Sequence, residues 1–195
     1  MLAVVGNDTL EFDTITYPVD AFALQLGPAD SLLTGATMVV VRDDNRFSDT
    51  IVSIVPGNLS ITSVVPQLKG PADRVSVSWT GAGNTDGYVL AAVKQDSVYE
   101  GVGWAQFVQG GFTSGTINDS AFTRTTFQGA EPNPGIYYIY VYAFTGSPDS
   151  ALSAPWLPVP FPAQLNDNID ETDFDGHIGT VVVSYFGTVE VLAAP

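Results

Sequence analysis

The sequence predicts an all-β protein of the sandwich class, and three observations lead to this prediction. Valine, threonine and aromatic residues are plentiful, and 19 glycines with 13 prolines in 195 residues supply many turns. This mixture favours short strands joined by tight loops. A hydrophobic content of 45% is ample for a packed core. Residues 134–146 carry apolar or aromatic side chains at every position of a strand pattern, as a strand buried on both faces does.

The segment 134–146 presents two different faces because side chains alternate along a strand. Large aromatic rings dominate one of them. One face carries Tyr137, Ile139, Val141 and Ala143, and the other carries Tyr138, Tyr140, Tyr142 and Phe144. An exposed aromatic stripe of this size would promote aggregation, so we expect the tyrosine face to be covered, first of all by the flanking β-segments. If it is open to solvent instead, it is the binding face.

The preceding segments supply further strands at a spacing typical of a sandwich. Residues 75–79 alternate apolar and polar side chains, and a turn rich in Gly, Asn and Asp then covers 80–87. The remaining strand candidates are 88–93, 104–108 and 121–127, and a proline-rich stretch covers 154–162.

These residues together resemble the fibronectin type III family, over about half of the chain. The matching positions are Val75-x-Val77-x-Trp79, Gly87-Tyr88-x-Leu90, Pro134-Gly135 and Tyr137-x-Ile139-x-Val141-x-Ala143-x-x-Gly146. The family usually has a leucine six residues before the strand-F tyrosine, and that position here is Glu131. The resemblance implies an immunoglobulin-like sandwich over residues 59–160. Another Greek-key sandwich with aromatic strands is the alternative.

The flanks, 1–58 and 161–195, also contain strand patterns, and we expect them to form a split second β-domain. In the C-terminal flank, 179–183 and 187–191 share a Gly-Thr-Val-x-Val frame, consistent with a hairpin through 184–186. Two strands cannot form a domain by themselves, so we expect this hairpin to pair with the N-terminal strands. The rival layout places the hairpin on the sandwich. The N-terminal candidates are 2–5, 9–16, 21–26, 37–42 and 50–55.

Charge and cysteine content exclude several functions. A net charge of −15, from 21 acids and 6 bases, would repel nucleic acid and offers no polybasic membrane contact. Without cysteine there is no disulfide or thiolate site. Residues 1–5 do not form a secretion signal, so we expect either a cytoplasmic protein or a mature fragment with an added methionine. No segment approaches transmembrane length.

An acidic segment, 166–179, is the one stretch with a metal-binding pattern. Its Glu171-x-Asp173-x-Asp175-Gly176-x-Ile178 resembles the first half of an EF-hand-type calcium loop, in which alternate carboxylates converge on the cation. Asp167 or Asp170 could supply the missing ligand, since position twelve of such a loop is Val182 rather than glutamate. The alternative is a solvated acidic linker that ends in an Asp-Gly turn.

Other candidate sites are fewer. Trp104 and Tyr99 could form a sugar-stacking platform, although aromatic residues are more often core. His177 is the only histidine and no Gly-x-Ser-x-Gly elbow occurs, so the sequence offers no serine-histidine catalytic pattern. We expect no enzymatic activity.

The sequence therefore predicts a non-catalytic extracellular or cell-surface protein that acts in adhesion or as a scaffold. It would contact a protein partner, or itself, through loops or through an edge strand. One alternative is a subunit of a surface filament or layer, with residues 2–5 as the donated strand. A carbohydrate-binding module is a further alternative.

Overall fold

The computed structural model confirms the all-β class. It describes residues 2–5, 8–11, 13–15, 21–23, 35, 37–44, 47–70, 73–98, 103–127, 129–146, 169–171, 174–176 and 180–193. Within these residues the helical segments are two short 3-10 turns, η2 (Gln95–Ser97) and η3 (Asp119–Phe122). No helix in this part of the chain is long and apolar enough to span a membrane.

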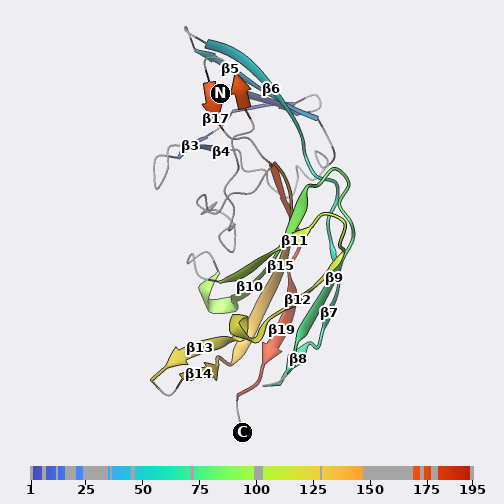
Figure 1. The fold of residues 1–195 in the computed structure, drawn as a ribbon, viewed down its shortest axis with the longest axis vertical. Helices are drawn as coiled ribbons and strands as arrows, with labels where there is room; N and C mark the ends of the chain where they lie inside the picture. Colours follow the sequence, from blue (N-terminus) through green and yellow to red (C-terminus); the bar gives the residue numbers. More distant parts are fainter. Residues whose placement is uncertain are drawn as a thin grey trace.

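The central unit is a β-sandwich of two sheets (Figure 1). The smaller sheet has the strand order β12-β9-β7, and the larger has β11-β10-β15-β19-β8, with β18 also paired to β15. The strands of the smaller sheet are β7 (Ile61–Val65), β9 (Val75–Trp79) and β12 (Ser114–Ile117). Those of the larger are β8 (Leu68–Lys69), β10 (Gly87–Lys94), β11 (Trp104–Gln109), β15 (Gly135–Thr145), β18 (Thr180–Val183) and β19 (Gly187–Val191).

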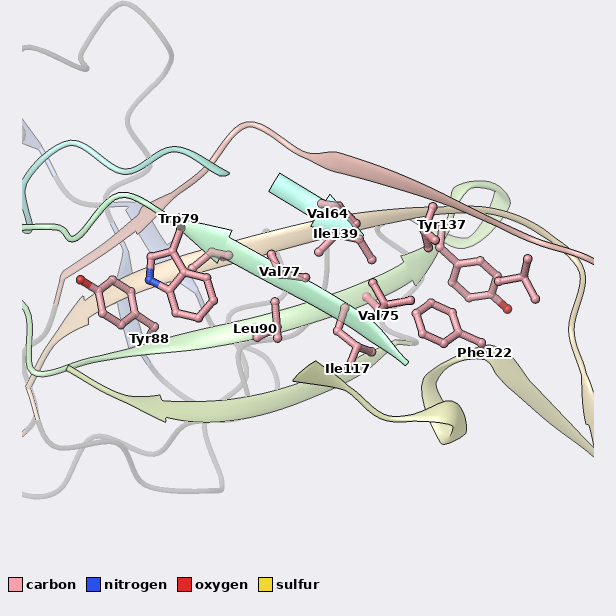
Figure 2. Packing of buried hydrophobic residues seen from close by; sticks show 14 of the residues in the cluster. Val64, Val75, Val77, Trp79, Tyr88, Leu90, Ile117, Phe122, Tyr137 and Ile139 are labelled. Carbon is pink, nitrogen blue, oxygen red and sulfur yellow. The ribbon is translucent and has the colours of Figure 1, made fainter. Parts of the chain in front are cut away.

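Alternate residues of β9, β10 and β15 fill the space between the two sheets, as the strand patterns predict (Figure 2). Trp79 and Tyr88 close one end of this core, with ring centroids 5.4 Å apart. Phe122 and Tyr137 close the other end, where their rings meet edge to face at 5.1 Å. Aliphatic side chains such as the fully buried Ile139 lie between the two aromatic pairs.

Tyr137 is fixed by its hydroxyl, which donates a hydrogen bond to the backbone carbonyl of Asn133 at 3.0 Å. Glu131 does not occupy the core beside it. It lies in a hairpin of β13 (Thr123–Thr126) and β14 (Gly129–Pro132), where it pairs with Arg124 at 3.8 Å. Phe122 instead supplies the apolar contact to Tyr137. Phe122 precedes the β13–β14 hairpin in the chain, whereas Glu131 lies within it.

The prediction of a C-terminal hairpin that pairs with the N-terminal strands is wrong. Both of its strands, β18 and β19, pair with β15 instead. They run along β15 one after the other as a single interrupted strand. At the interruption, Ser184 N donates to the Val141 carbonyl at 2.9 Å and Ser184 Oγ accepts from Val141 N at 3.0 Å. Residues 180–191, which the sequence analysis assigned to the second domain, therefore complete the larger sheet of the sandwich.

The N-terminal segment forms a separate antiparallel sheet with the order β2-β1-β5-β6. In Figure 1 its long strands β5 and β6 lie beyond one end of the sandwich. The connection after β6 is held by Gly57 N, which donates to the Gly83 carbonyl at 2.8 Å. The strands are β1 (Leu2–Val5), β2 (Asp8–Glu11), β5 (Thr37–Asp44) and β6 (Phe47–Ile54), with a further pair of β3 (Asp13–Ile15) and β4 (Ala21–Ala23).

Candidate functional site

The outer face of β15 is buried over most of its length. Tyr142 is fully buried, and Tyr140 and Phe144 are nearly so. They pack with Val89, Ala91 and Val93 of β10 in a second apolar cluster, on the side of the sheet away from the sandwich core. The burial expected for the tyrosine stripe is therefore found at these three positions.

The same cluster opens to solvent at the interruption between β18 and β19. Tyr138 is only partly buried, and its ring stacks on Phe186 with centroids 4.2 Å apart. Tyr185 stacks on Phe186 in turn at 4.6 Å, with an angle of 22° between the rings. Tyr185 is nevertheless 80% exposed. We call Tyr138, Tyr185 and Phe186 the aromatic surface.

Two small residues explain why the aromatic surface forms here. Ser184 is buried and bonded to Val141, which fixes the chain before the two aromatic residues. Gly187 fixes it afterwards, because a Cβ atom at that position would lie 2.6 Å from Val64 Cγ2, and glycine alone permits so close an approach. Tyr185 and Phe186 lie between these two anchors, and their rings stack against each other.

The neighbouring residues on the outer face continue this surface with mixed polarity. The strand register places Thr188 opposite Tyr138, and Glu190 opposite both Ile136 and Leu68. Residues directly opposite in a sheet point to the same side. Ile136 and Leu68 are 44% and 52% exposed. The aromatic surface thus adjoins exposed aliphatic groups and a single carboxylate from β19, a composition suited to a protein contact.

An exposed tyrosine held by stacking is well suited to act as a binding anchor. Tyrosine offers a large contact area with two side-chain torsions, so ordering it on binding costs little entropy. Stacking on Phe186 reduces that cost further, since the ring is already held in the free protein. Anchors of this type are enriched among the residues that dominate protein–protein binding energy.

The predicted sugar platform is only partly placed by the structure. Trp104 lies at the start of β11, opposite Ala92, and its partly buried side chain packs against the core between the sheets. Tyr99 lies outside the described residues. The platform therefore stays a prediction.

The acidic segment forms a short hairpin of β16 (Ile169–Glu171) and β17 (Phe174–Gly176). Its register pairs Asp170 with Asp175 and Glu171 with Phe174, while Asp173 lies outside the described residues. Among the residues described, no group of three or more His, Cys, Asp or Glu side chains lies together as a metal site. Calcium binding stays a prediction.

The proposed donor strand of a filament is already paired. β1 is hydrogen-bonded to β2 on one side and to β5 on the other. Donating residues 2–5 to another copy would break both ladders, so this arrangement does not favour strand exchange.

Sequence reasoning missed Tyr185 and Phe186, which it placed in the turn of a hairpin. A signal was present, since hairpin turns are dominated by Gly, Asn, Asp, Pro and Ser rather than by adjacent aromatic residues. Two aromatic side chains at this position favour a packed or binding segment over a simple turn.

No protein-family model matches the chain, and no curated protein matches it in sequence. The function is therefore argued from the fold and from the aromatic surface.

Proposed function

We propose that this protein is a non-catalytic extracellular or cell-surface adhesion or scaffold protein, and that its sandwich binds other proteins through the aromatic surface. The observation that carries the proposal is Tyr185, which is 80% exposed and still stacked on Phe186. An exposed, pre-ordered aromatic ring on a rigid sheet is the expected form of a binding anchor.

The strand order supports a fibronectin type III-like module as the carrier of this surface. The order β7-β9-β12 against β11-β10-β15-β19 corresponds to strands A, B and E against C′, C, F and G of such sandwiches. The hydrogen bond from Tyr137 to the Asn133 carbonyl has the form of a tyrosine corner. Modules of this class commonly serve recognition and display, which makes the class a support for the role, although a shared fold does not fix function.

The net charge and the residues around the aromatic surface also support a protein-binding role. The net charge of −15 disfavours nucleic acid as a partner and favours a protein with basic groups. The polar side chains that adjoin the aromatic surface on β19 are Thr188 and Glu190, opposite Tyr138 and Ile136. Aromatic and aliphatic groups with a few polar neighbours are a composition that supports a binding role.

Photo-crosslinking tests the proposal in cells that produce the protein. A photoreactive phenylalanine analogue replaces Tyr185, and a matched control carries it at Phe127, which is fully exposed in the β13–β14 turn. We expect discrete protein adducts at position 185, and none at position 127, on intact cells that an external antibody labels. Equal adducts at the two positions, or labelling only after the cells are opened, would refute the proposal.

A further inference from the structure

Two segments of the chain carry the acceptor pattern for N-linked glycosylation, an asparagine followed two residues later by serine or threonine, with no proline between them. They are Asn58-Leu59-Ser60 and Asn118-Asp119-Ser120. So short a pattern also arises by chance, and its surroundings decide whether it can carry a glycan. An acceptor has to lie on the surface, because the oligosaccharide is bulky and polar and has no place inside the fold.

The segment 118–120 meets this requirement. It leads from the end of β12 into η3, and all three of its residues are exposed. The backbone of Asn118 is extended, with φ −73° and ψ 156°. The carboxylate of Asp119 is engaged separately, since Oδ1 lies 2.6 Å from Nζ of the buried Lys69. A glycan on the exposed Asn118 side chain can therefore extend into solvent without replacing this ion pair.

The usual structural reason for an asparagine at this position does not apply to Asn118. It occupies the N-cap of η3, where an asparagine side chain commonly accepts a hydrogen bond from a backbone N–H of the turn that follows. The side chain of Asn118 makes no such capping bond. The backbone closes the turn instead, because Ala121 N donates to the Asn118 carbonyl at 3.0 Å. The side-chain amide is thus not used to cap the turn.

The other acceptor pattern, 58–60, is held against the sandwich. Leu59 packs on the core between the two sheets. Ser60 N donates to Thr80 Oγ1 at 2.9 Å, and Thr80 N donates to the Ser60 carbonyl at 2.9 Å. These contacts tie the segment to the end of β9, so we expect 118–120 to be the preferred acceptor.

We propose that Asn118 is an N-glycosylation site. In the transfer, Asn118 Nδ2 attacks the anomeric carbon of an oligosaccharide carried on a lipid diphosphate. The Nδ2–carbon bond forms, the bond from that carbon to the diphosphate oxygen breaks, and the lipid diphosphate leaves. The proton lost from Nδ2 passes to a base of the transferase. The inference rests on the extracellular or cell-surface location proposed above, because this modification belongs to secreted chains.

The position of Asn118 is compatible with the proposed binding surface. Asn118 follows β12, an edge strand of the smaller sheet that, in the described part of the chain, pairs with β9 alone. The aromatic surface lies on the larger sheet, on the face directed away from the smaller one. A bulky polar group at the end of β12 would hinder pairing of that edge with another chain and would leave the aromatic surface accessible.

Intact-mass spectrometry tests the site on the full chain, secreted from a eukaryotic host behind a cleavable signal. We expect the parent protein to carry an oligosaccharide that an N-glycosidase removes, leaving aspartate at position 118. Asn118→Gln and Ser120→Ala should each abolish the modification, whereas Ser120→Thr should keep it. Asn58→Gln is the matched control and should leave the glycan in place. A parent protein secreted without glycan, or a glycan that persists in Asn118→Gln, would overturn the proposal.

Peptide mass spectrometry of the protein from the cells that produce it separates this inference from the proposed function. We expect a glycan on the peptide that contains Asn118, in protein that an external antibody labels on intact cells. Labelled protein with unmodified Asn118 would overturn the glycosylation site and leave the proposed function standing. Labelling only after the cells are opened would refute the proposed location, and with it glycosylation of Asn118 in these cells.

Discussion

The two faces of β15 have similar apolar composition and different surroundings. On the inner face, Tyr137, Ile139, Val141 and Ala143 are all buried against the opposite sheet. On the outer face, burial is complete at Tyr142 and is partial at Tyr138, next to the exposed Tyr185. An apolar stripe thus does not by itself mean core. What lies over each part of the stripe decides whether it stabilises the fold or offers a contact.

The largest difference in stability between the two faces should appear when an isoleucine on each face is replaced by alanine. Ile139, on the inner face, is fully buried, and Ile136, on the outer face of the same strand, is 44% exposed. Ile139→Ala should lower the free energy of unfolding by about 3 kcal/mol, and Ile136→Ala by about 1 kcal/mol or less. Urea unfolding measures both. Equal losses would mean that the outer face is as closely packed here as the inner one.

The end of the inner face near Tyr137 is closed by a buried lysine. Lys69 is 3% exposed, its Nζ lies 2.6 Å from Asp119 Oδ1, and it sits 5.5 Å from the centre of the Phe122 ring. Asp119→Ala should cost about 2 kcal/mol, because it leaves a buried ammonium without its carboxylate. The half-exposed position of Asp119 lets water replace part of that interaction.

The matched change is Lys69→Met, which leaves Asp119 in contact with water and keeps the apolar stem. We expect it to cost less than Asp119→Ala in the same urea experiment. The reverse order would show that the lysine stem, rather than its charge, seals this end of the core.

The individual strands could be predicted from the sequence because their patterns are local. The predicted strand at 134–146 is β15, and those at 75–79, 88–93 and 104–108 match β9, β10 and β11 to within a residue or two. Each depends on alternation that neighbouring residues carry themselves. The 121–127 candidate was only partly right, since η3 occupies its first residues and β13 the rest.

The partners of the strands could not be predicted in the same way. The Gly-Thr-Val-x-Val frames at 179–183 and 187–191 suit a hairpin and an interrupted strand equally well, because the side chains alternate with a period of two in both. The choice depends on distant contacts, namely Ser184 with Val141 and Gly187 with Val64. The aromatic surface depends on that interruption, so it was missed together with the pairing.

The tyrosine corner should contribute a smaller, measurable amount to the inner face. Tyr137→Phe removes the hydroxyl that donates to the Asn133 carbonyl and should cost about 1 kcal/mol. Tyr185→Phe is the control, since that ring is exposed, and it should change nothing measurable. A neutral Tyr137→Phe would mean that the carbonyl finds another donor.

The stability difference between the parent protein and Tyr137→Phe should also depend on pH. Burial, and then the negative charge of Asp96, raise the pKa of the Tyr137 hydroxyl, while its hydrogen bond to Asn133 acts in the opposite direction. The folded chain therefore holds this proton more tightly than the unfolded chain, whose tyrosines ionise near pH 10. The stability advantage of the parent over Tyr137→Phe should be constant below about pH 9 and shrink as the pH rises through 10. An advantage that grows with pH would contradict the raised pKa.

The smallest effect on stability should come from Tyr185, the residue that we propose as the binding anchor. Tyr185→Ala removes a ring that is 80% exposed, so the free energy of unfolding should change by about 0.5 kcal/mol or less. Phe186→Ala should cost more, because Phe186 packs on both Tyr138 and Tyr140 at centroid distances of 4.2 and 6.1 Å. Urea unfolding of the two variants measures both losses and so distinguishes an exposed contact residue from the residue that supports its ring. If Tyr185→Ala destabilises the protein as much as Phe186→Ala does, the ring is part of the packing. The outer face of β15 would then be structural along its whole length.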